Sequence, residues 1–462
     1  MIHPLRKHGL VMRYITGSGL KSPIINNGQL RDLIKSEYGL ENIRSISGFL
    51  RNKGAFSFPA LKTGLYSAAV LNTEKDYTGY SSVWVRDNIF IAFAHYIDGQ
   101  PMRATRVLSA LMSYFKKYRQ RFLDVISSSV DPKNPMNRPH VRFDGNNLEE
   151  LPEHWPHAQN DALGYFLWLY CKLAIEHLLK PVSEDIETLG LFVRFFRAIR
   201  YWEDEDSGHW EETRKISASS IGVVVAALQQ ARKLLPTSFS PTTFYDKDKT
   251  FDAESVGELI APGMSALEKI LPEECIQSDP QKKRRVDSAL LFLIYPLHLV
   301  KEEIASQILQ NVIDNLQGDY GVRRYLGDSY WAPDYKEKLP PDKRTIDFSD
   351  NMSSRDSLLP AKTLEAQWCI FDPILSCIFG NRFQTTHQKD DLDRQAFHLN
   401  RALGQITSEG LQLEIPAFRC PELYYLRRGK YVPNDHVPLL WAQANLIVAL
   451  KIMEQSCSLA VC

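Results

Sequence analysis

The chain has 462 residues, of which 44% are apolar and 24% are charged, and its 55 Lys and Arg residues balance its 55 Asp and Glu residues. This is the composition of an ordinary globular protein, and without a basic excess a neutral ligand is expected rather than nucleic acid. The most apolar run, residues 289–300, is interrupted by Pro296 and His298. It is shorter than the roughly 18 residues of a membrane span, so no membrane partner is expected.

Apolar residues recur at helical spacing along most of the chain, and strand-like alternation is scarce. The predicted helices, in chain order, span residues 89–97, 104–126, 158–179, 186–201, 216–235, 256–270, 286–293, 302–316, 364–379, 392–403 and 439–453. The first 80 residues have room for one more. This pattern predicts an all-α domain of paired antiparallel helices.

No low-complexity linker divides the chain, so we expect one domain over residues 61–462, preceded by an N-terminal extension over residues 1–60. Long loops within the domain are rich in Pro, Asp, Asn and aromatic residues, and long ordered loops are usually functional. These loops span residues 131–156, 325–359 and 418–438. Within the second loop, residues 336–350 could alternatively form a mobile flap.

Cysteines and histidines give no sign of a metal site or of a bound cofactor. The seven cysteines are scattered without a Cys-x-x-Cys pair, and His154 and His157 lack an evident set of further ligands. An ordinary loop role is favoured for these two histidines. The first ten residues carry charges where a signal peptide needs an apolar run, so reduced thiols and a cytoplasmic location are expected.

Polar and aromatic residues gather in the loops that open alternate predicted helices. The clusters are residues 84–87, 155–161, 209–212, 323–328 and 421–424. If consecutive helices are antiparallel, these loops share one end of the bundle and line one cavity. They supply the aromatic faces, arginines and paired acids that a carbohydrate site needs. There is no Gly-x-Ser-x-Gly elbow and no phosphate-binding loop to suggest nucleophilic or nucleotide chemistry.

Several motifs resemble those of family 15 of the glycoside hydrolases and, more closely, the homologous N-terminal domains of phosphorylase kinase alpha and beta subunits. They are Trp-Val-Arg-Asp (84–87), Trp-Glu-Glu (210–212) and a Glu ahead of Pro-Leu-Leu-Trp-Ala-Gln (438–443). Further matching stretches keep the same order between Thr63 and Met453. The resemblance implies an (α/α)6 barrel, a six-hairpin toroid, whose funnel binds the non-reducing end of an α-glucan or a short oligosaccharide.

The resemblance also implies roles for individual residues. Glu211 is expected to be the general acid and Glu422 the general base of an inverting exo-glucosidase, with the two carboxyl groups about 6.5 to 9.5 Å apart. Arg86 and Asp87 are expected to hold the hydroxyls of the terminal sugar. The complete set predicted to bind substrate is Trp84, Arg86, Asp87, Trp155, Asp161, Trp210, Glu212 and Arg324.

These residues also have structural explanations. Helix capping alone would explain Glu211 and Glu212. A structural ion pair would explain Arg86 and Asp87, and core packing would explain the tryptophans. Glu414 competes with Glu422 for the role of base.

The activity is open as well. A non-hydrolytic glucan sensor or scaffold, or an enzyme for trehalose or isomaltose, would keep the same motifs. An unrelated helical scaffold is the least favoured reading, and the oligomeric state is open.

Overall fold

The computed structural model describes residues 14–16, 19–21, 23–70, 79–238, 252–340, 343–344, 349, 352–359, 363–409 and 415–460. Glu414, the alternative candidate base, lies outside the described residues, as does part of the predicted flap over residues 336–350. None of the helices within these ranges combines the length and the apolar content that a bilayer crossing requires.

Within the described residues, twelve helices alternate along the chain between an outer and an inner position. The outer helices are α2 (Leu40–Asn52), α4 (Pro101–Lys117), α7 (Ser183–Ala198), α9 (Ala253–Ile270), α11 (Glu302–Asn315) and α15 (Lys389–Gly404). The inner helices are α3 (Val85–Ile97), α6 (Asn160–Ile175), α8 (Ala218–Ser238), α10 (Leu291–Ile294), α14 (Phe371–Thr386) and α16 (Leu440–Ala460).

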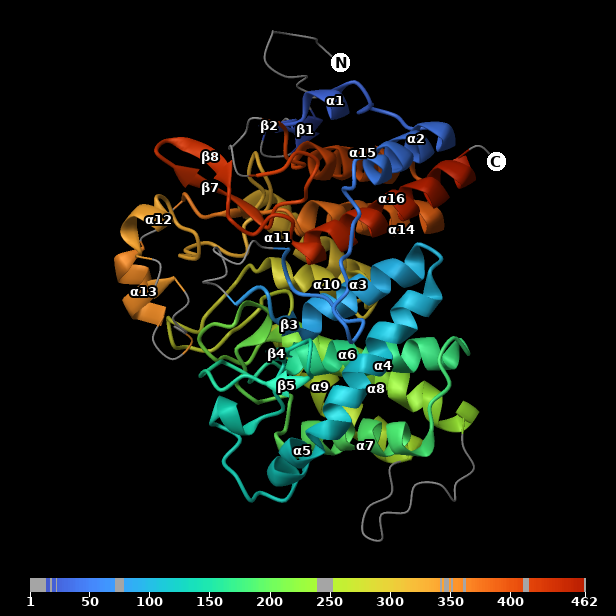
Figure 1. Ribbon diagram of the computed structural model, residues 1–462, viewed down its shortest axis with the longest axis vertical. Coiled ribbons are helices and arrows are strands. Elements are labelled where there is room, and N and C mark those ends of the chain that lie inside the picture. The colour runs from blue at the N-terminus through green and yellow to red at the C-terminus, as the bar shows by residue number, and fades with distance from the viewer. Residues whose placement is uncertain are drawn as a thin grey trace.

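The inner helices form a closed ring. Each one contacts the next, and α16 returns to α3, while each also packs on an outer helix that neighbours it in sequence. The predicted (α/α)6 barrel is therefore confirmed (Figure 1).

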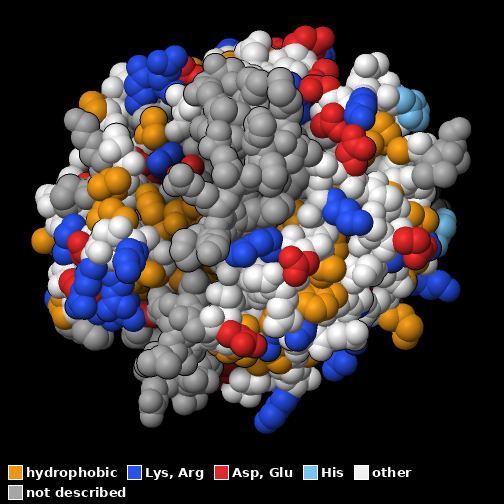
Figure 2. Space-filling view, turned by 90° about the horizontal axis from the view of Figure 1, so that it is seen from above, with side chains coloured by type: hydrophobic (Ala, Val, Ile, Leu, Met, Phe, Trp, Pro, Cys, Tyr) orange, Lys and Arg blue, Asp and Glu red, His pale blue; other side chains and the backbone are white. Residues whose placement is uncertain are grey.

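Burial explains which helices lie inside. In α6, every residue from Asn160 to Cys171 is buried, whereas α4 buries only a stripe that includes Ala104, Leu108 and Leu111. A helix that is apolar on all sides is stable only when it is enclosed, and an amphipathic one lies at the surface. On the face that Figure 2 shows, positive and negative side chains are interspersed where residues are described.

Three predicted helices differ from the observed ones. The span 104–126 divides at Tyr118 into α4 and α5 (Arg119–Ile126), and 286–293 becomes η5 (Ser288–Leu290) followed by the short α10. The span 364–379 begins too early, because Gln367 and Trp368 form strand β6 before α14 starts at Phe371. Pairing with a strand about 55 residues later overrides the local helical pattern there.

Short antiparallel strands tie the loops at one end of the barrel. One sheet has the order β3 (Val83–Trp84), β4 (Arg142–Asp144) and β5 (Glu149–Glu150), and another has β6 (Gln367–Trp368), β7 (Leu423–Arg427) and β8 (Lys430–Pro433). A separate pair joins β1 (Tyr14–Thr16) to β2 (Gly19–Lys21). The remaining short helices are α1 (Gly28–Arg31), η2 (Pro135–Asn137), η3 (Gly208–Trp210), α12 (Tyr335–Lys338) and α13 (Met352–Leu358).

A described part of the first 60 residues contributes directly to the barrel. Helix α2 packs on α16, and its Ile43, Ile46 and Leu50 belong to the same hydrophobic core as the inner helices. The division into an extension over residues 1–60 and a domain over residues 61–462 stays a prediction.

Candidate active site

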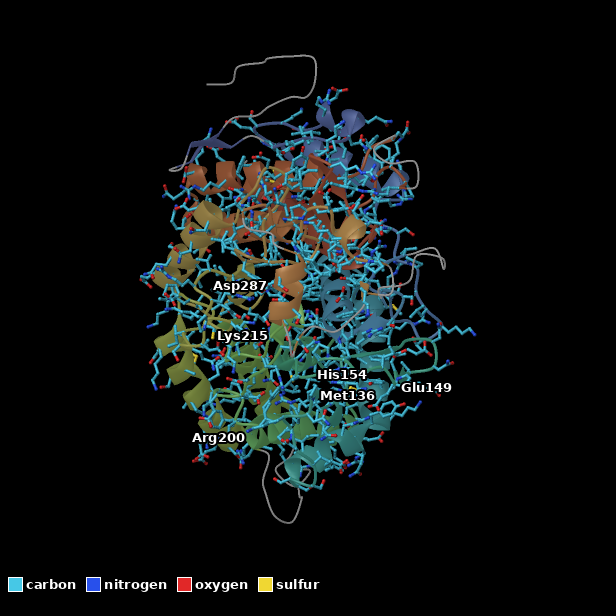
Figure 3. All side chains as sticks on the ribbon, turned by 90° about the vertical axis from the view of Figure 1, so that its left-hand side faces the viewer. Met136, Glu149, His154, Arg200, Lys215 and Asp287 are labelled. Carbon is cyan, nitrogen blue, oxygen red and sulfur yellow. The ribbon has the colours of Figure 1, made fainter. Side chains whose placement is uncertain are left out.

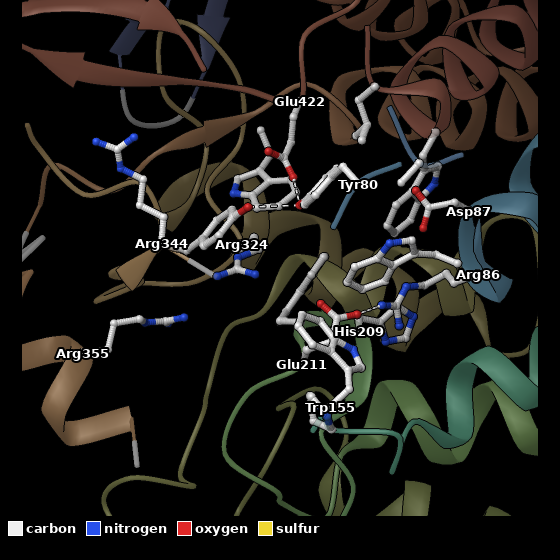
Figure 4. A pocket seen from close by; sticks show the side chains of 18 of the residues that line it. Tyr80, Arg86, Asp87, Trp155, His209, Glu211, Arg324, Arg344, Arg355 and Glu422 are labelled. Atoms are coloured by element: carbon white, nitrogen blue, oxygen red, sulfur yellow. Dashed lines mark hydrogen bonds and ion pairs between the residues drawn. The ribbon is translucent and has the colours of Figure 1, made fainter. Parts of the chain in front are cut away.

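A pocket opens at the end of the barrel where the inner helices begin. Its wall combines carboxylates, arginines and aromatic rings from distant segments (Figure 4). The lining residues are Ala68, Tyr80, Trp84, Arg86, Asp87, Trp155, Pro156, His209, Trp210, Glu211, Arg324, Tyr330, Tyr335, Arg344, Arg355, Trp368, Glu422, Leu439 and Trp441. The expectation that the starts of alternate helices line one cavity is confirmed.

Glu211 is turned into the pocket by the local backbone. It follows the single turn of η3 and adopts a φ of 52°, a left-handed conformation that is uncommon for a residue other than glycine. Such conformations persist where the surroundings enforce them, often at functional sites. Its side chain is 18% exposed and accepts a hydrogen bond from Nη2 of Arg86.

The surroundings of Glu211 favour its protonated form. Burial raises the pKa of Glu211 to about 8, and this effect is larger than the opposing one of the Arg86 guanidinium. A carboxyl that keeps its proton near neutral pH has the protonation state of a general acid.

Arg86 and Asp87 lie in the first turn of α3, directly after strand β3. Both line the pocket, and burial raises the pKa of Asp87 to about 7. Nη1 of Arg86 lies 2.5 Å from Oδ2 of Asp161, which is fully buried. Asp161 is not among the residues that line the pocket, and its substrate-binding role stays a prediction. It lies behind Arg86 and orients the guanidinium, which faces the cavity.

Glu212 points away from the cavity and is also absent from the pocket wall. Its carboxylate lies 2.8 Å from a guanidinium nitrogen of Arg324 and of Arg355, and 3.5 Å from Nη1 of Arg284. Burial raises the pKa of Glu212, but the arginines outweigh it and hold the pKa below its ordinary value. Its substrate contact stays a prediction, and in the structure it anchors two arginines that do line the pocket.

A further network supports the loop that carries Glu211. The indole nitrogen of Trp210 donates to Oδ1 of Asp287 at 2.9 Å, and Asp287 pairs with Arg284 at 3.3 Å. Figure 3 shows Asp287 near Lys215, which interacts with it electrostatically. The tryptophan side chain is therefore held from behind by buried charges.

Glu422 lies on the other side of the pocket, just before strand β7 (Figure 4). Its carboxylate accepts hydrogen bonds from three donors. Tyr80 Oη donates to Oε1 at 2.6 Å, while Nδ1 of His436 at 2.5 Å and Nδ2 of Asn434 both reach Oε2. These three donors hold the carboxylate in one orientation at the pocket wall.

The three predicted tryptophans all line the pocket. Trp84 and Trp155 pack edge to face, with ring centroids 5.3 Å apart and an interplanar angle of 88°. Neither indole nitrogen has a hydrogen-bond partner among the described residues, whereas that of Trp210 is bonded. Trp84 and Trp155 therefore pack against each other and also face the pocket, so core packing does not exclude contact with a ligand.

The sequence did not single out several side chains that the structure adds to the site. They are Tyr80, Tyr330, Arg344, Arg355, Trp368, Asn434, His436 and Trp441. The last three carried a usable signal, because they lie in or beside the motif around Pro438. Arg355 carried none, since only the fold brings α13 to the pocket.

The chain is similar to named proteins of two kinds. It is 25% identical over 84% of its length to a probable phosphorylase b kinase regulatory subunit alpha of Caenorhabditis elegans, and covers 32% of that protein. It is 31% identical over 40% of its length to the uncharacterized lipoprotein YgeQ of Escherichia coli K12, of which it covers 77%. The chain thus spans about a third of the length of the kinase subunits that it matches.

Solved structures with the same fold are glycosidases. A wild-type glycosidase has a TM-score of 0.62 at 16% identity, over 90% of this chain and 97% of that one. A bacterial glucoamylase complexed with acarbose has a TM-score of 0.55 at 16% identity, over 85% of this chain and 53% of that one. The sequence model of the family Glycosyl hydrolases family 15 matches residues 47–449, and the chain therefore belongs to that family.

Proposed function

We propose that the protein is an inverting, exo-acting α-glucosidase that releases glucose from the non-reducing ends of α-glucans or of short α-glucosides. The proposal rests mainly on one observation. Two glutamates, the partly buried Glu211 and the buried Glu422, face one pocket from opposite sides and have opposite surroundings. This is the arrangement that a single displacement with inversion needs.

In the proposed reaction, Glu211 gives its proton to the glycosidic oxygen as the bond to the anomeric carbon breaks. Glu422 takes a proton from the water that attacks the opposite face of that carbon. The carboxyl groups must be about 6.5 to 9.5 Å apart to leave room for this water, and that separation stays a prediction. No cofactor takes part in these steps.

The remaining wall fits a sugar. Arg86 and Asp87 offer a donor and an acceptor for vicinal hydroxyls, and Arg324 lies against the rings of Trp210 and Trp368. Trp84 and Trp155 offer ring faces for the C–H surfaces of a sugar. An aromatic and charged pocket of this kind supports an α-glucan or oligosaccharide as the substrate.

A second candidate function is glucan binding without hydrolysis. The observation that favours it is the similarity to the phosphorylase b kinase subunits, which are named as regulatory. Such a protein would keep the pocket and release no sugar. The cytoplasmic location of either form stays a prediction.

Proton NMR of the reaction products tests the proposal. The purified chain is incubated with maltose, maltotriose, isomaltose, trehalose and soluble starch, and spectra are taken from the first minutes. Glu211→Gln and Glu422→Gln are run in parallel. Glu274→Gln is the matched control, because Glu274 is buried away from the pocket wall and burial raises its pKa to about 8, so a neutral amide replaces a largely neutral carboxyl.

We expect β-glucose to form first with the wild type and with Glu274→Gln, and no glucose to form with the other two variants. The substrates that are cleaved identify the glycosidic linkage that the enzyme hydrolyses. If α-glucose forms first, the inverting mechanism is wrong. If no sugar is released while a glucan still binds, the regulatory function takes its place.

A further inference from the structure

We propose that His436 is a positioning residue for Glu422, which holds this carboxylate through Oε2 and leaves only Oε1 able to take a proton from water. This inference rests on the proposed function, because it assigns a partner to the base of that reaction.

His436 and Glu422 are joined through both side chain and main chain. The distance from Nδ1 of His436 to Oε2 of Glu422 is 2.5 Å, and both residues are buried, with exposed side-chain fractions of 0% and 1%. The backbone N–H of Glu422 also donates to the carbonyl of His436 at 3.1 Å. The loop before α16 is thus held in register with the segment that carries the base.

The imidazole is clamped by aromatic rings. Its face stacks on Tyr80 with centroids 3.6 Å apart and an interplanar angle of 13°, and Trp331 meets it edge-on at 5.9 Å. Tyr80 itself donates to Oε1 of Glu422. One ring stack therefore fixes two donors, and these reach different oxygens of the same carboxylate.

Counting donors assigns the reactive oxygen. Oε2 of Glu422 receives hydrogen bonds from His436 and Asn434, and this uses both of its lone pairs. Oε1 receives one bond from Tyr80 and keeps a lone pair. When the O–H bond of water breaks as its oxygen bonds to the anomeric carbon, the proton passes to Oε1.

The proton on His436 determines whether this arrangement holds. An ionised carboxylate can accept only from a protonated Nδ1, because an unprotonated nitrogen would face it lone pair to lone pair. Other titratable or charged groups surround the pair. They include Tyr80, Tyr330, which is hydrogen-bonded to Tyr80, Asp435 paired with Lys336, and Asp87, Tyr335 and Cys369, which interact electrostatically with Glu422.

Two substitutions at position 436 distinguish the hydrogen bond to Glu422 from the packing of the imidazole ring. In His436→Asn, the amide nitrogen takes nearly the place of Nδ1 and still donates, whereas His436→Phe keeps a ring and loses the donor. Asp435→Asn is the matched control, since it removes the ion pair with Lys336 from the same loop and leaves the donor at 436.

We expect His436→Phe to lower kcat by about 10- to 100-fold with KM changed by less than about 3-fold, because the base and not the substrate loses a contact. His436→Asn should regain most of kcat, and Asp435→Asn should keep the wild-type kcat and KM. An equal loss of kcat in both 436 variants, or a loss in His436→Phe that appears in KM and not in kcat, overturns the inference.

A readout without turnover uses the full chain labelled with ¹⁵N-histidine. In the wild type, Nδ1 of His436 should carry a proton with a strongly downfield ¹H resonance, and this resonance should move upfield in Glu422→Gln, where the charged acceptor is gone. The same resonance in both forms overturns the inference, even if sugar is released. If the resonance differs but no sugar is released, the pairing stands and the proposed function fails.

Discussion

The two sides of the pocket hold the same type of residue in opposite ways. Glu211 is hydrogen-bonded to a single guanidinium, that of Arg86, which also pairs with Asp161. Burial raises the pKa of Glu211 by more than this guanidinium lowers it. Glu422 is surrounded by donors from Tyr80, Asn434 and His436. The surroundings of the two glutamates, rather than the residue type, therefore distinguish the candidate acid from the candidate base.

The two sides also differ in how they are supported. Behind Glu211 lies a network of buried charges around Glu212, whereas the Glu422 side relies on strand pairing and stacked aromatic rings. Damage to the first should therefore reduce stability, and damage to the second should mainly change the reactivity of the carboxylate.

The largest effect is expected from the two carboxyl groups themselves. Glu211→Gln and Glu422→Gln should each lower kcat by about 1,000-fold or more on the best natural substrate. With α-glucosyl fluoride, whose leaving group needs no proton, Glu211→Gln should regain most of its activity and Glu422→Gln should not. Fluoride release measures both. If the two variants behave alike, the assignment of acid and base is wrong.

The buried charges are tested by Glu212→Gln. Removing the anion that Arg324, Arg355 and Arg284 share should lower the free energy of unfolding by about 3 to 5 kcal/mol, because buried positive charges lose their partner. Denaturant unfolding followed by circular dichroism measures it. Glu37→Gln, which breaks an exposed pair with Lys389, is the control and should leave stability unchanged. Equal effects would show that the cluster is not important for stability.

The raised pKa of Glu211 predicts the basic limb of the pH profile. A general acid must be protonated, and the pKa of Glu211 is about 8, so kcat/KM should fall as the pH rises through about 8. In Glu211→Gln assayed with α-glucosyl fluoride, this limb should be absent. If kcat/KM instead falls with rising pH at a midpoint well below pH 7, Glu211 is already ionised at neutral pH and cannot be the acid.

The smallest effect is expected at the aromatic wall. Trp155→Phe keeps an aromatic ring at the pocket wall but offers a smaller ring face to the sugar, so KM should rise about 3- to 5-fold with kcat nearly unchanged. Trp202→Phe, at a tryptophan outside the pocket wall, is the control. A change in kcat without a change in KM would mean that Trp155 acts on the chemical step.

Much of the architecture follows from local patterns. Helical periodicity predicted an all-α chain of paired helices, and the order of short motifs predicted both the barrel and the loops that line its pocket. The periodic pattern was wrong at residues 364–379, where Gln367 and Trp368 pair with β7 instead of starting a helix. A local pattern carries no information about a partner strand so distant in sequence.

The sequence by itself therefore determined the family, the barrel and the identity of the two candidate glutamates, since these depend on periodicity and on motif order. Only the tertiary structure decided which way neighbouring side chains face. The positive φ of Glu211 sends it into the pocket and leaves Glu212 to the arginines behind. Tyr80, Arg355 and His436 join the site through contacts between distant segments, because the packing of the helices, rather than local sequence, brings them together.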